Sequence, residues 1–360
     1  MIVNPKVRLA VFRRLVRSTP SPSAFLQAAQ LPPEELEFAG DLDRRSRYLS
    51  NWETALDARM KELDALRERL REHEDLECEG KTPEPKTADA PGRYLLGTRL
   101  VKGSVTSVYL ATDLDSGRPV VLKRLSRNLH PKKADVGYVS REIMVGCKIN
   151  HPGIVPVLNW MEDEKSLWYV MKYVAHERLF EKIQQDHGLP WKTAVDITIQ
   201  LCDILHTVHT AGLVHRDIKP MNTGLQEIQG GGYHVILFDF GIAQEIGKPN
   251  ADPDGLLRGT LKYMAPEQFV SNTLVQPRVD VYQLGLVLYE MLTGTNPFKD
   301  VSDPEIARKK QGGIPSLYES KPGLVLPAGL EAVVLRALEK NPVERFQSAD
   351  EMAEALRDVQ

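Results

Sequence analysis

Two short polar motifs constrain this chain more than any other feature. LVHRDIKPMN spans residues 213–222, and FDFG spans residues 238–241, with the strand-like run HVILF leading into the second motif. Together they supply two carboxylates and an amide on neighbouring loops. Magnesium prefers such hard oxygen ligands and keeps nucleotide phosphates in its shell. The two motifs therefore predict a site for a phosphate compound held by magnesium.

A lysine and a glutamate further upstream fit the same chemistry. Lys123 ends the apolar run VVL, and Glu142 follows nineteen residues later within the helical stretch SREIMVGCKIN. A glutamate that holds the lysine in place would let it offer its charge to phosphate oxygens.

The chain divides at a linker. Residues 79–91, EGKTPEPKTADAP, carry three prolines and no large apolar side chain, which is typical of a linker. We expect a helical region over 1–78, because strong helix formers dominate there. A heptad-like stripe from Leu49 to His73 predicts either packing within the chain or self-association as a coiled coil.

The first seventeen residues predict a basic amphipathic helix. They hold five basic side chains and no acidic one. An ordinary helix of the N-terminal region is the favoured interpretation, and contact with an anionic membrane surface is the alternative.

Beyond the linker, residues 92–360 predict a small β-rich part followed by a larger helical part. Three short β-type runs are expected at 94–100, 107–112 and 119–123. One strand is expected at 234–238, and helices are expected at 191–211, 280–292, 330–339 and 349–359.

Composition excludes several classes of protein. The net charge of −3 gives no basic excess for nucleic acid, so a charged partner must be bound by a local patch. Cys78, Cys147 and Cys202 are odd in number and far apart, which predicts neither a disulfide framework nor a zinc site. No apolar run approaches the roughly 18 residues needed to cross a bilayer. We expect a soluble, cytoplasmic protein.

Four further motifs follow in a fixed order: Gly259-Thr260, MAPE at 264–267, DVYQLGLVLYEMLTG from Asp280, and NPVERF at 341–346. With this series, residues 92–360 resemble the eukaryotic-type (Hanks-type) Ser/Thr protein kinase family, with the character of its bacterial members. The resemblance implies an α+β bilobal protein kinase fold, with a small β-rich N-lobe and a larger helical C-lobe. It also implies ATP and magnesium, or manganese, as cofactors, and proteins as substrates.

The resemblance implies a role for each matching residue. Asp217 would orient or deprotonate the substrate hydroxyl, and Lys219 would stabilise the transferring phosphoryl group. Lys123 would bind the α- and β-phosphates and pair with Glu142. Metal ions would be held by Asn222 and Asp239. The nucleotide would contact Gly103, Val108, Val121, Lys123, Met171, Tyr173, Val174 and Leu225.

Other matching residues would be structural. Asp280 would brace the catalytic loop, and Glu267 would pair with Arg345 in the helical lobe. His215 would support packing and would not act as a base. Lys219 and Thr260 resemble the Ser/Thr branch of the family, in which the threonine bonds the catalytic aspartate and lysine.

Three glycine positions depart from the family pattern. The phosphate-covering loop keeps only its middle glycine, Gly103, which predicts a stiffer flap. Gly146 stands where a bulky side chain usually stacks on Phe240, and we expect an unfilled gap there. Gly224 stands where a leucine normally floors the adenine, so the neighbouring Leu225 or a shift in register is expected to supply that floor.

We also expect regulation to differ from the family pattern. Between Asp239 and Glu267 the only hydroxyl side chains are Thr260 and Tyr263. Arg216 would therefore be met by Glu245, Asp252 or Asp254 in place of a phosphorylated residue. The N-terminal region is then the expected regulator. An active, autophosphorylating Ser/Thr protein kinase is the leading interpretation, and a pseudokinase or weakly active scaffold is the alternative.

Overall fold

A computed structural model describes residues 93–102, 106–126, 133–162, 166–250, 259–270 and 273–359 of the chain. The chain divides into two compact units, residues 1–66 and 67–360, and every described residue belongs to the second. The predictions for the helical region 1–78, its heptad-like stripe, the linker 79–91 and the Gly103 flap fall outside the described residues.

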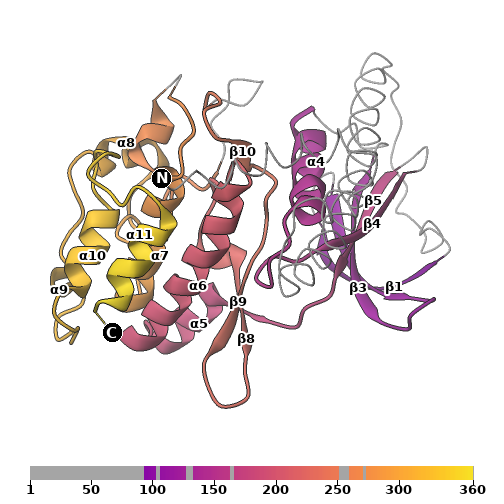
Figure 1. Cartoon of the computed structure of the whole chain (residues 1–360), viewed down its shortest axis with the longest axis horizontal. Coiled ribbons are helices and arrows are strands. Elements are labelled where there is room, and N and C mark those ends of the chain that lie inside the picture. The colour runs from indigo at the N-terminus through magenta and orange to yellow at the C-terminus, as the bar shows by residue number, and fades with distance from the viewer. Residues whose placement is uncertain are drawn as a thin grey trace, which may run out of the picture. The chain divides into compact units, whose positions relative to one another are not determined.

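An antiparallel sheet of five strands forms the N-lobe, as Figure 1 shows. The strands are β1 (Tyr94–Lys102), β2 (Thr106–Asp113), β3 (Pro119–Ser126), β4 (Val157–Glu162) and β5 (Ser166–Lys172), in the spatial order β1-β2-β3-β5-β4. The three strands expected from the sequence are confirmed, each with a slightly longer span.

The two-residue period of β3 decides which side chains reach the functional face. Val120 and Leu122 are buried in the small core of the sheet. Val121 and Lys123 alternate with them and therefore point to the opposite face. Helix α4 (Lys133–Lys148) follows β3 and carries Glu142 as expected.

Helices build the C-lobe around a buried centre. They are α5 (Leu179–Asp186), α6 (Trp191–Thr210), α7 (Arg278–Thr293), α8 (Asp303–Lys310), α9 (Leu317–Ser320), α10 (Leu330–Ala337) and α11 (Ala349–Arg357). Helix α7 is buried without interruption from Val279 to Thr293. A helix buried on all sides belongs in the centre of a domain. The four helices expected from the sequence are confirmed to within two residues at each end.

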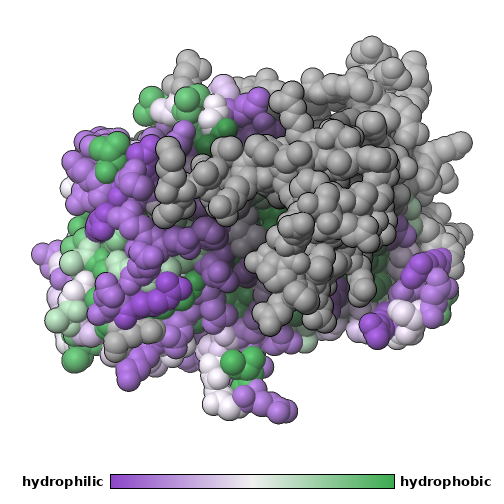
Figure 2. Space-filling view, viewed as in Figure 1, coloured by the Kyte–Doolittle hydropathy of each residue, from purple (hydrophilic) through white to green (hydrophobic). Residues whose placement is uncertain are grey.

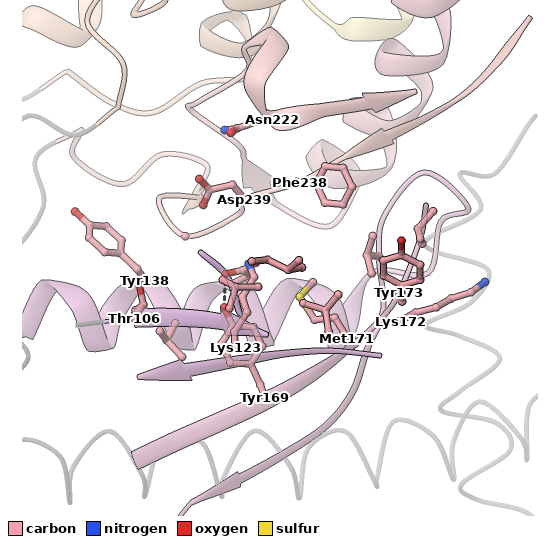
Figure 3. Close-up of a pocket in the computed structure, with 18 of the residues that line it drawn as sticks. Thr106, Lys123, Tyr138, Tyr169, Met171, Lys172, Tyr173, Asn222, Phe238 and Asp239 are labelled. Atoms are coloured by element: carbon pink, nitrogen blue, oxygen red, sulfur yellow. Dashed lines mark hydrogen bonds and ion pairs between the residues drawn. The ribbon is translucent and has the colours of Figure 1, made fainter. Parts of the chain in front are cut away.

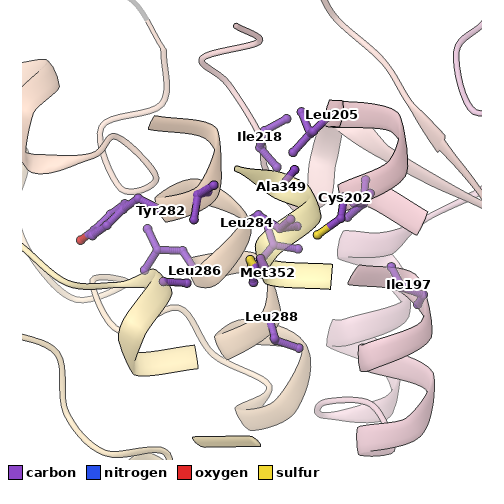
Figure 4. Packing of buried hydrophobic residues seen from close by; sticks show 14 of the residues in the cluster. Ile197, Cys202, Leu205, Ile218, Tyr282, Leu284, Leu286, Leu288, Ala349 and Met352 are labelled. Atoms are coloured by element: carbon purple, nitrogen blue, oxygen red, sulfur yellow. The ribbon is translucent and has the colours of Figure 1, made fainter. Parts of the chain in front are cut away.

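Figure 4 shows how α7 packs. Its apolar side chains Leu284 and Leu288 face those of α6 and α11, among them Ile197, Cys202, Leu205, Ala349 and Met352, whereas Leu286 points to the other side of the helix. Cys202 is a free, buried cysteine. Burial raises the pKa of the Cys202 thiol, so this cysteine serves as an apolar core residue.

Short strands place the polar loops at the edge of this core. One sheet joins β6 (Glu177–Arg178), β8 (Thr223–Glu227) and β9 (Tyr233–Leu237), and the other joins β7 (Leu213–Val214) and β10 (Gln244–Glu245). The strand expected at 234–238 is therefore confirmed with a shift of one residue. The catalytic loop lies between β7 and β8, and Asp239 follows β9.

Figure 2 shows that hydrophilic residues cover most of this face of the C-lobe, with hydrophobic residues scattered among them. No helix within the described ranges is long and apolar enough to span a bilayer.

Candidate active site

Asp217 is the centre of a dense group of hydrogen bonds. Its Oδ2 accepts bonds from Lys219 Nζ at 2.5 Å and from Asn222 Nδ2 at 3.0 Å. Its Oδ1 accepts from the hydroxyl of Thr260 at 3.0 Å and from the Thr260 amide at 3.1 Å. Lys219 also donates to the Thr260 hydroxyl at 2.7 Å. The structure thus brings the predicted residues of the catalytic loop and Thr260 into one cluster.

The surroundings keep Asp217 ionised. Burial opposes the charge, but Lys219 attracts and hydrogen-bonds the carboxylate, and the net effect lowers its pKa below the ordinary value. Asp217 therefore offers a carboxylate oxygen to a hydroxyl donor at neutral pH.

Helix α7 holds the backbone of this loop with two side chains. The Asp280 carboxylate accepts from the amides of His215 and Arg216, each at 2.8 Å, as the sequence predicted. Gln283 accepts from the Ile218 amide at 2.8 Å and donates to the Arg216 carbonyl at 2.7 Å. These bonds satisfy backbone groups on both sides of Asp217. Sequence reasoning missed Gln283, although its place one turn after Asp280 was a usable signal.

His215 has the packing role expected of it. Its Nε2 lies 3.1 Å from the Phe238 carbonyl, and its Nδ1 accepts from the Asp217 amide at 3.2 Å. The ring stacks on Phe240 with centroids 4.6 Å apart. Both ring nitrogens are therefore engaged away from the reacting group.

On the N-lobe side, Lys123 forms an ion pair with Glu142, as expected. The hydroxyl of Tyr169 donates to the other carboxylate oxygen of Glu142 at 2.5 Å. Tyr169 lies opposite Lys123 in the register of β3 and β5, which is why it reaches the same pair. Burial and the Glu142 charge raise the pKa of Tyr169, so it acts as a donor. Its role was not predicted from the sequence.

Asp239 and Asn222, the residues predicted to bind metal, both line the cleft. Figure 3 shows both residues on one side of the cleft, across from Lys123. The Phe238 amide donates to the Asn222 carbonyl at 2.8 Å, which ties the two loops together. Burial and the Glu142 charge raise the pKa of Asp239, while Lys123 lowers it. A carboxylate in such a place is stabilised by a cation.

The donors suit magnesium. Asn222 donates through Nδ2 to Asp217, which leaves its Oδ1 as an acceptor. With Asp239 this makes a small set of hard oxygens, which magnesium completes with substrate phosphates. Within the described ranges no cluster of three or more His, Cys, Asp or Glu forms a dedicated metal cage. A metal ion here would therefore depend on phosphate oxygens.

The cleft between the sheet and the C-lobe has a volume of about 670 Å³. Val108, Val121, Met171, Tyr173 and Val174 line it as predicted, together with Lys123, Glu142, Asn222 and Asp239. Figure 3 shows Met171 and Tyr173 near Phe238, at the end of the cleft away from Tyr138. These apolar side chains suit a flat aromatic base.

The prediction for Leu225 is wrong. Leu225 is 1% exposed and belongs to the C-lobe core, because β8 turns its side chain away from the cleft. Met221, His176 and Phe238 line the cleft instead. A Cβ at Gly224 would stand 2.7 Å from Phe238 and 2.8 Å from His176. The two rings therefore take the place of the side chain that Gly224 lacks.

The expected gap at Gly146 is absent as well. A Cβ there would lie 2.5 Å from Val157 Cγ2 and 3.1 Å from the Val157 amide nitrogen. Strand β4 approaches α4 so closely that only glycine fits. The packing beside Phe240, which is 4% exposed, is thus complete without a larger side chain.

Amide groups of residues 244–250 hold the Arg216 guanidinium, and the expectation that Asp252 or Asp254 meets it stays a prediction. The guanidinium donates to the Asn250 carbonyl at 2.7 Å and to the Asn250 side-chain oxygen at 3.1 Å. It also donates to the side-chain oxygen of Gln244. Glu245 pairs instead with Lys248 at 3.8 Å. Asp252 and Asp254 lie outside the described residues.

The ion pair of Glu267 and Arg345, which was expected to be structural, was predicted correctly. Arg345 donates to both carboxylate oxygens of Glu267, at 2.7 and 2.8 Å, and is 1% exposed. A bidentate pair of this kind fixes the MAPE segment to the end of the C-lobe.

Comparisons with known proteins agree with this geometry. A family model described as "protein kinase domain" matches residues 94–355. The serine/threonine-protein kinase PknB of Mycobacterium leprae is 35% identical over 267 residues, which cover 72% of this chain and 42% of that protein. A probable serine/threonine-protein kinase of Streptomyces coelicolor is 35% identical over 270 residues, covering 72% and 39%. The chain therefore spans about two fifths of the length of these relatives.

Proposed function

This chain belongs to the protein kinase family, and we propose that it transfers the γ-phosphate of ATP to serine and threonine hydroxyls of proteins. The observation that carries the proposal is the cluster of Asp217, Lys219 and Thr260 beside the oxygens of Asn222 and Asp239. The groups proposed to act on the acceptor hydroxyl and the groups proposed to bind the metal ion thus lie within one site. Relatives named as serine/threonine-protein kinases support the same activity.

On the nucleotide side, Lys123 would place its charge on the phosphates while Glu142 and Tyr169 fix its position. Asn222 and Asp239 would hold magnesium, or manganese, which neutralises phosphate charge when bound. The apolar part of the cleft would hold the adenine, with Val121 and Met171 on the N-lobe side and Phe238 on the C-lobe side.

On the acceptor side, Asp217 would accept a hydrogen bond from the substrate hydroxyl and take its proton as the oxygen becomes bonded to the γ-phosphorus. The bond from that phosphorus to the bridging oxygen of ATP would break at the same time, and ADP would leave. Lys219 would stabilise the negative charge of the transferred group. Thr260 forms hydrogen bonds with both side chains and so fixes their relative position. This threonine and Lys219 support serine and threonine as acceptors in preference to tyrosine.

Labelled phosphate transfer from magnesium ATP tests the proposal. We expect the wild-type protein to label itself and a protein substrate, with phosphoserine or phosphothreonine as products, and Asp239→Asn to do neither. Thr82 and Thr87 in the linker are the autophosphorylation sites we propose to map. Absence of transfer by the wild type, with intact folding, would favour the inactive scaffold, for which the described residues offer no specific support.

We further propose that residues 1–78 regulate the enzyme, as a packed helical region or through self-association, in the cytoplasm. The support is the composition of residues 239–267, in which Thr260 and Tyr263 are the only hydroxyl side chains, so this segment offers no other acceptor for a regulatory phosphate. Removal of residues 1–66, the first compact unit, should change the rate of transfer. Unchanged kinetics and an unchanged oligomeric state would remove this proposal.

A further inference from the structure

A second hollow lies beside the catalytic loop, on the C-lobe. Its volume is about 640 Å³, and Lys219, Asn222 and Thr260 form the side that adjoins the active site. Because Lys219 and Thr260 contact Asp217 directly, a hydroxyl presented to Asp217 would have its flanking residues in or near this hollow.

The charged side chains around the hollow are mostly basic. Arg178, Lys219, Lys262 and Lys299 line it. Lys219 is already paired with Asp217, which leaves three cationic side chains for a ligand. Arg178 and Lys299 are exposed, so their charges can meet an incoming chain.

Glu290 is the one acidic residue among the groups that line the hollow. It is 3% exposed, and the Tyr263 hydroxyl donates to its Oε2 at 2.5 Å. Burial raises the pKa of its carboxyl above the ordinary value. Glu290 therefore does little to offset the basic side chains, because its charge is disfavoured and its oxygen is already engaged.

Two contacts fix the position of Lys262. Its Nζ donates to the Lys299 carbonyl at 2.5 Å, and its own carbonyl accepts from the buried Lys310 Nζ at 2.9 Å. Lys310 is 2% exposed, so a buried donor behind the wall of the hollow holds the loop that carries Lys262. The cationic character is built into the loop and is not left to a freely moving side chain.

We propose that this hollow selects protein substrates in which acidic side chains flank the phosphorylated serine or threonine. This inference rests on the proposed kinase activity and adds a substrate class to it. The chain as a whole carries a net charge of −3, so an acidic segment would be repelled on average and attracted here by the local patch.

The experiment uses the full chain with magnesium ATP and three synthetic peptides. The peptides share one threonine and differ only in the three residues on each side of it, which are aspartate, alanine or lysine. We expect kcat/KM to be highest for the aspartate peptide, by about fivefold over alanine, and lowest for the lysine peptide. The advantage of the aspartate peptide should shrink as salt is raised.

Charge reversal then assigns the effect to the hollow. Lys299→Glu and Arg178→Glu should each lower the aspartate-to-lysine ratio of kcat/KM by about fivefold. Lys340→Glu is the matched control, because Lys340 is exposed and lies outside the residues that line the hollow. The control should keep the wild-type ratio.

The outcomes separate this inference from the proposed function. Equal kcat/KM for the three peptides, or a preference for lysine, overturns the inference and leaves the kinase activity standing. Lack of transfer to every peptide and to the protein itself overturns the proposed activity. In that case, binding of the same peptides with alanine in place of threonine still tests the hollow, and equal affinities for the aspartate and lysine forms overturn its selectivity.

Discussion

The active site has one buried carboxylate on the acceptor side and one on the nucleotide side, and their pKa values are shifted in opposite directions. Asp217 has Lys219, Asn222 and Thr260 around it, and its pKa is lowered. Asp239 is buried near the Glu142 charge, and its pKa is raised. The acceptor side therefore supplies its own positive charge, whereas the nucleotide side gains full stabilisation only from a bound cation.

The largest expected effect separates the two carboxylates. Asp217→Asn and Asp239→Asn should each lower kcat by at least about 100-fold, because each removes a group used in the transfer. Only Asp239→Asn should abolish the dependence of ATP binding on magnesium. Calorimetric titration with and without magnesium measures this. If Asp217→Asn weakened magnesium-dependent ATP binding as much as Asp239→Asn does, the proposed difference between the two carboxylates would be contradicted.

The next effect concerns the hydrogen bonds that hold Arg216, next to Asp217 on the acceptor side. Asn250→Ala removes a side-chain acceptor from the buried Arg216 guanidinium, which should cost about 2 kcal/mol in the free energy of unfolding. The rate of transfer should fall with it, because Arg216 adjoins Asp217 in the catalytic loop.

Asn250→Asp is the matched control, since it keeps an oxygen at the same position and adds a charge opposite to that of Arg216. Denaturant unfolding and steady-state rates decide the result. Equal stability of the alanine variant and the wild type would show that the amides do not support this loop. Phosphatase treatment should leave the wild-type rate unchanged.

A smaller effect probes packing on the nucleotide side. Gly146→Ala places a methyl group 2.5 Å from Val157, and such overpacking should destabilise the protein by about 1–2 kcal/mol. Gly137→Ala on the same helix is the control, because its nearest neighbour is the Arg141 side chain at 3.8 Å. The control should be neutral or stabilising. If Gly146→Ala were the more stable of the two, the predicted gap would exist after all.

The smallest effect is a dependence on pH. Burial lowers the pKa of Lys310 to about 7. Between that value and its ordinary pKa near 10.5, the unfolded chain binds a proton that the folded chain does not, so stability rises with pH.

Relative to Lys310→Met, the wild type should therefore gain about 1 kcal/mol between pH 7 and pH 8. Thermal unfolding of both proteins across this range provides the measurement. The same change in stability for both proteins over this range would mean that the contact of Lys310 with the Phe298 ring, 4.0 Å from Nζ to the centroid, offsets burial and keeps its pKa from falling.

Most of the fold could be predicted because its strands and helices follow from patterns within short stretches of the sequence. The β-type runs at 94–100, 107–112 and 119–123 and the helical stretches at 191–211 and 280–292 predicted their elements directly. The resemblance to protein kinases, which the polar motifs carry, predicted the contacts of Asp217 with Lys219 and Thr260 and the pairs Lys123–Glu142 and Glu267–Arg345.

The remaining features depend on contacts between distant segments. Val157 fills the space beside Gly146, and Phe238 with His176 replaces the expected floor at Leu225. Asn250, which no motif singled out, meets Arg216. Nothing in the spacing of these residues reports how closely a strand approaches a helix or which loop oxygen reaches a guanidinium.

Helix α7 has a consequence for the order of folding. Asp280 and Gln283 bind the catalytic loop, and Glu290, about two turns further along the same buried helix, binds Tyr263 beside the acceptor hollow. These side chains can form their bonds only once the helix is enclosed by its neighbours. A refolding chain therefore recovers its catalytic loop and its acceptor hollow together, in the step that excludes water from the centre of the C-lobe, and neither can appear in advance of that step.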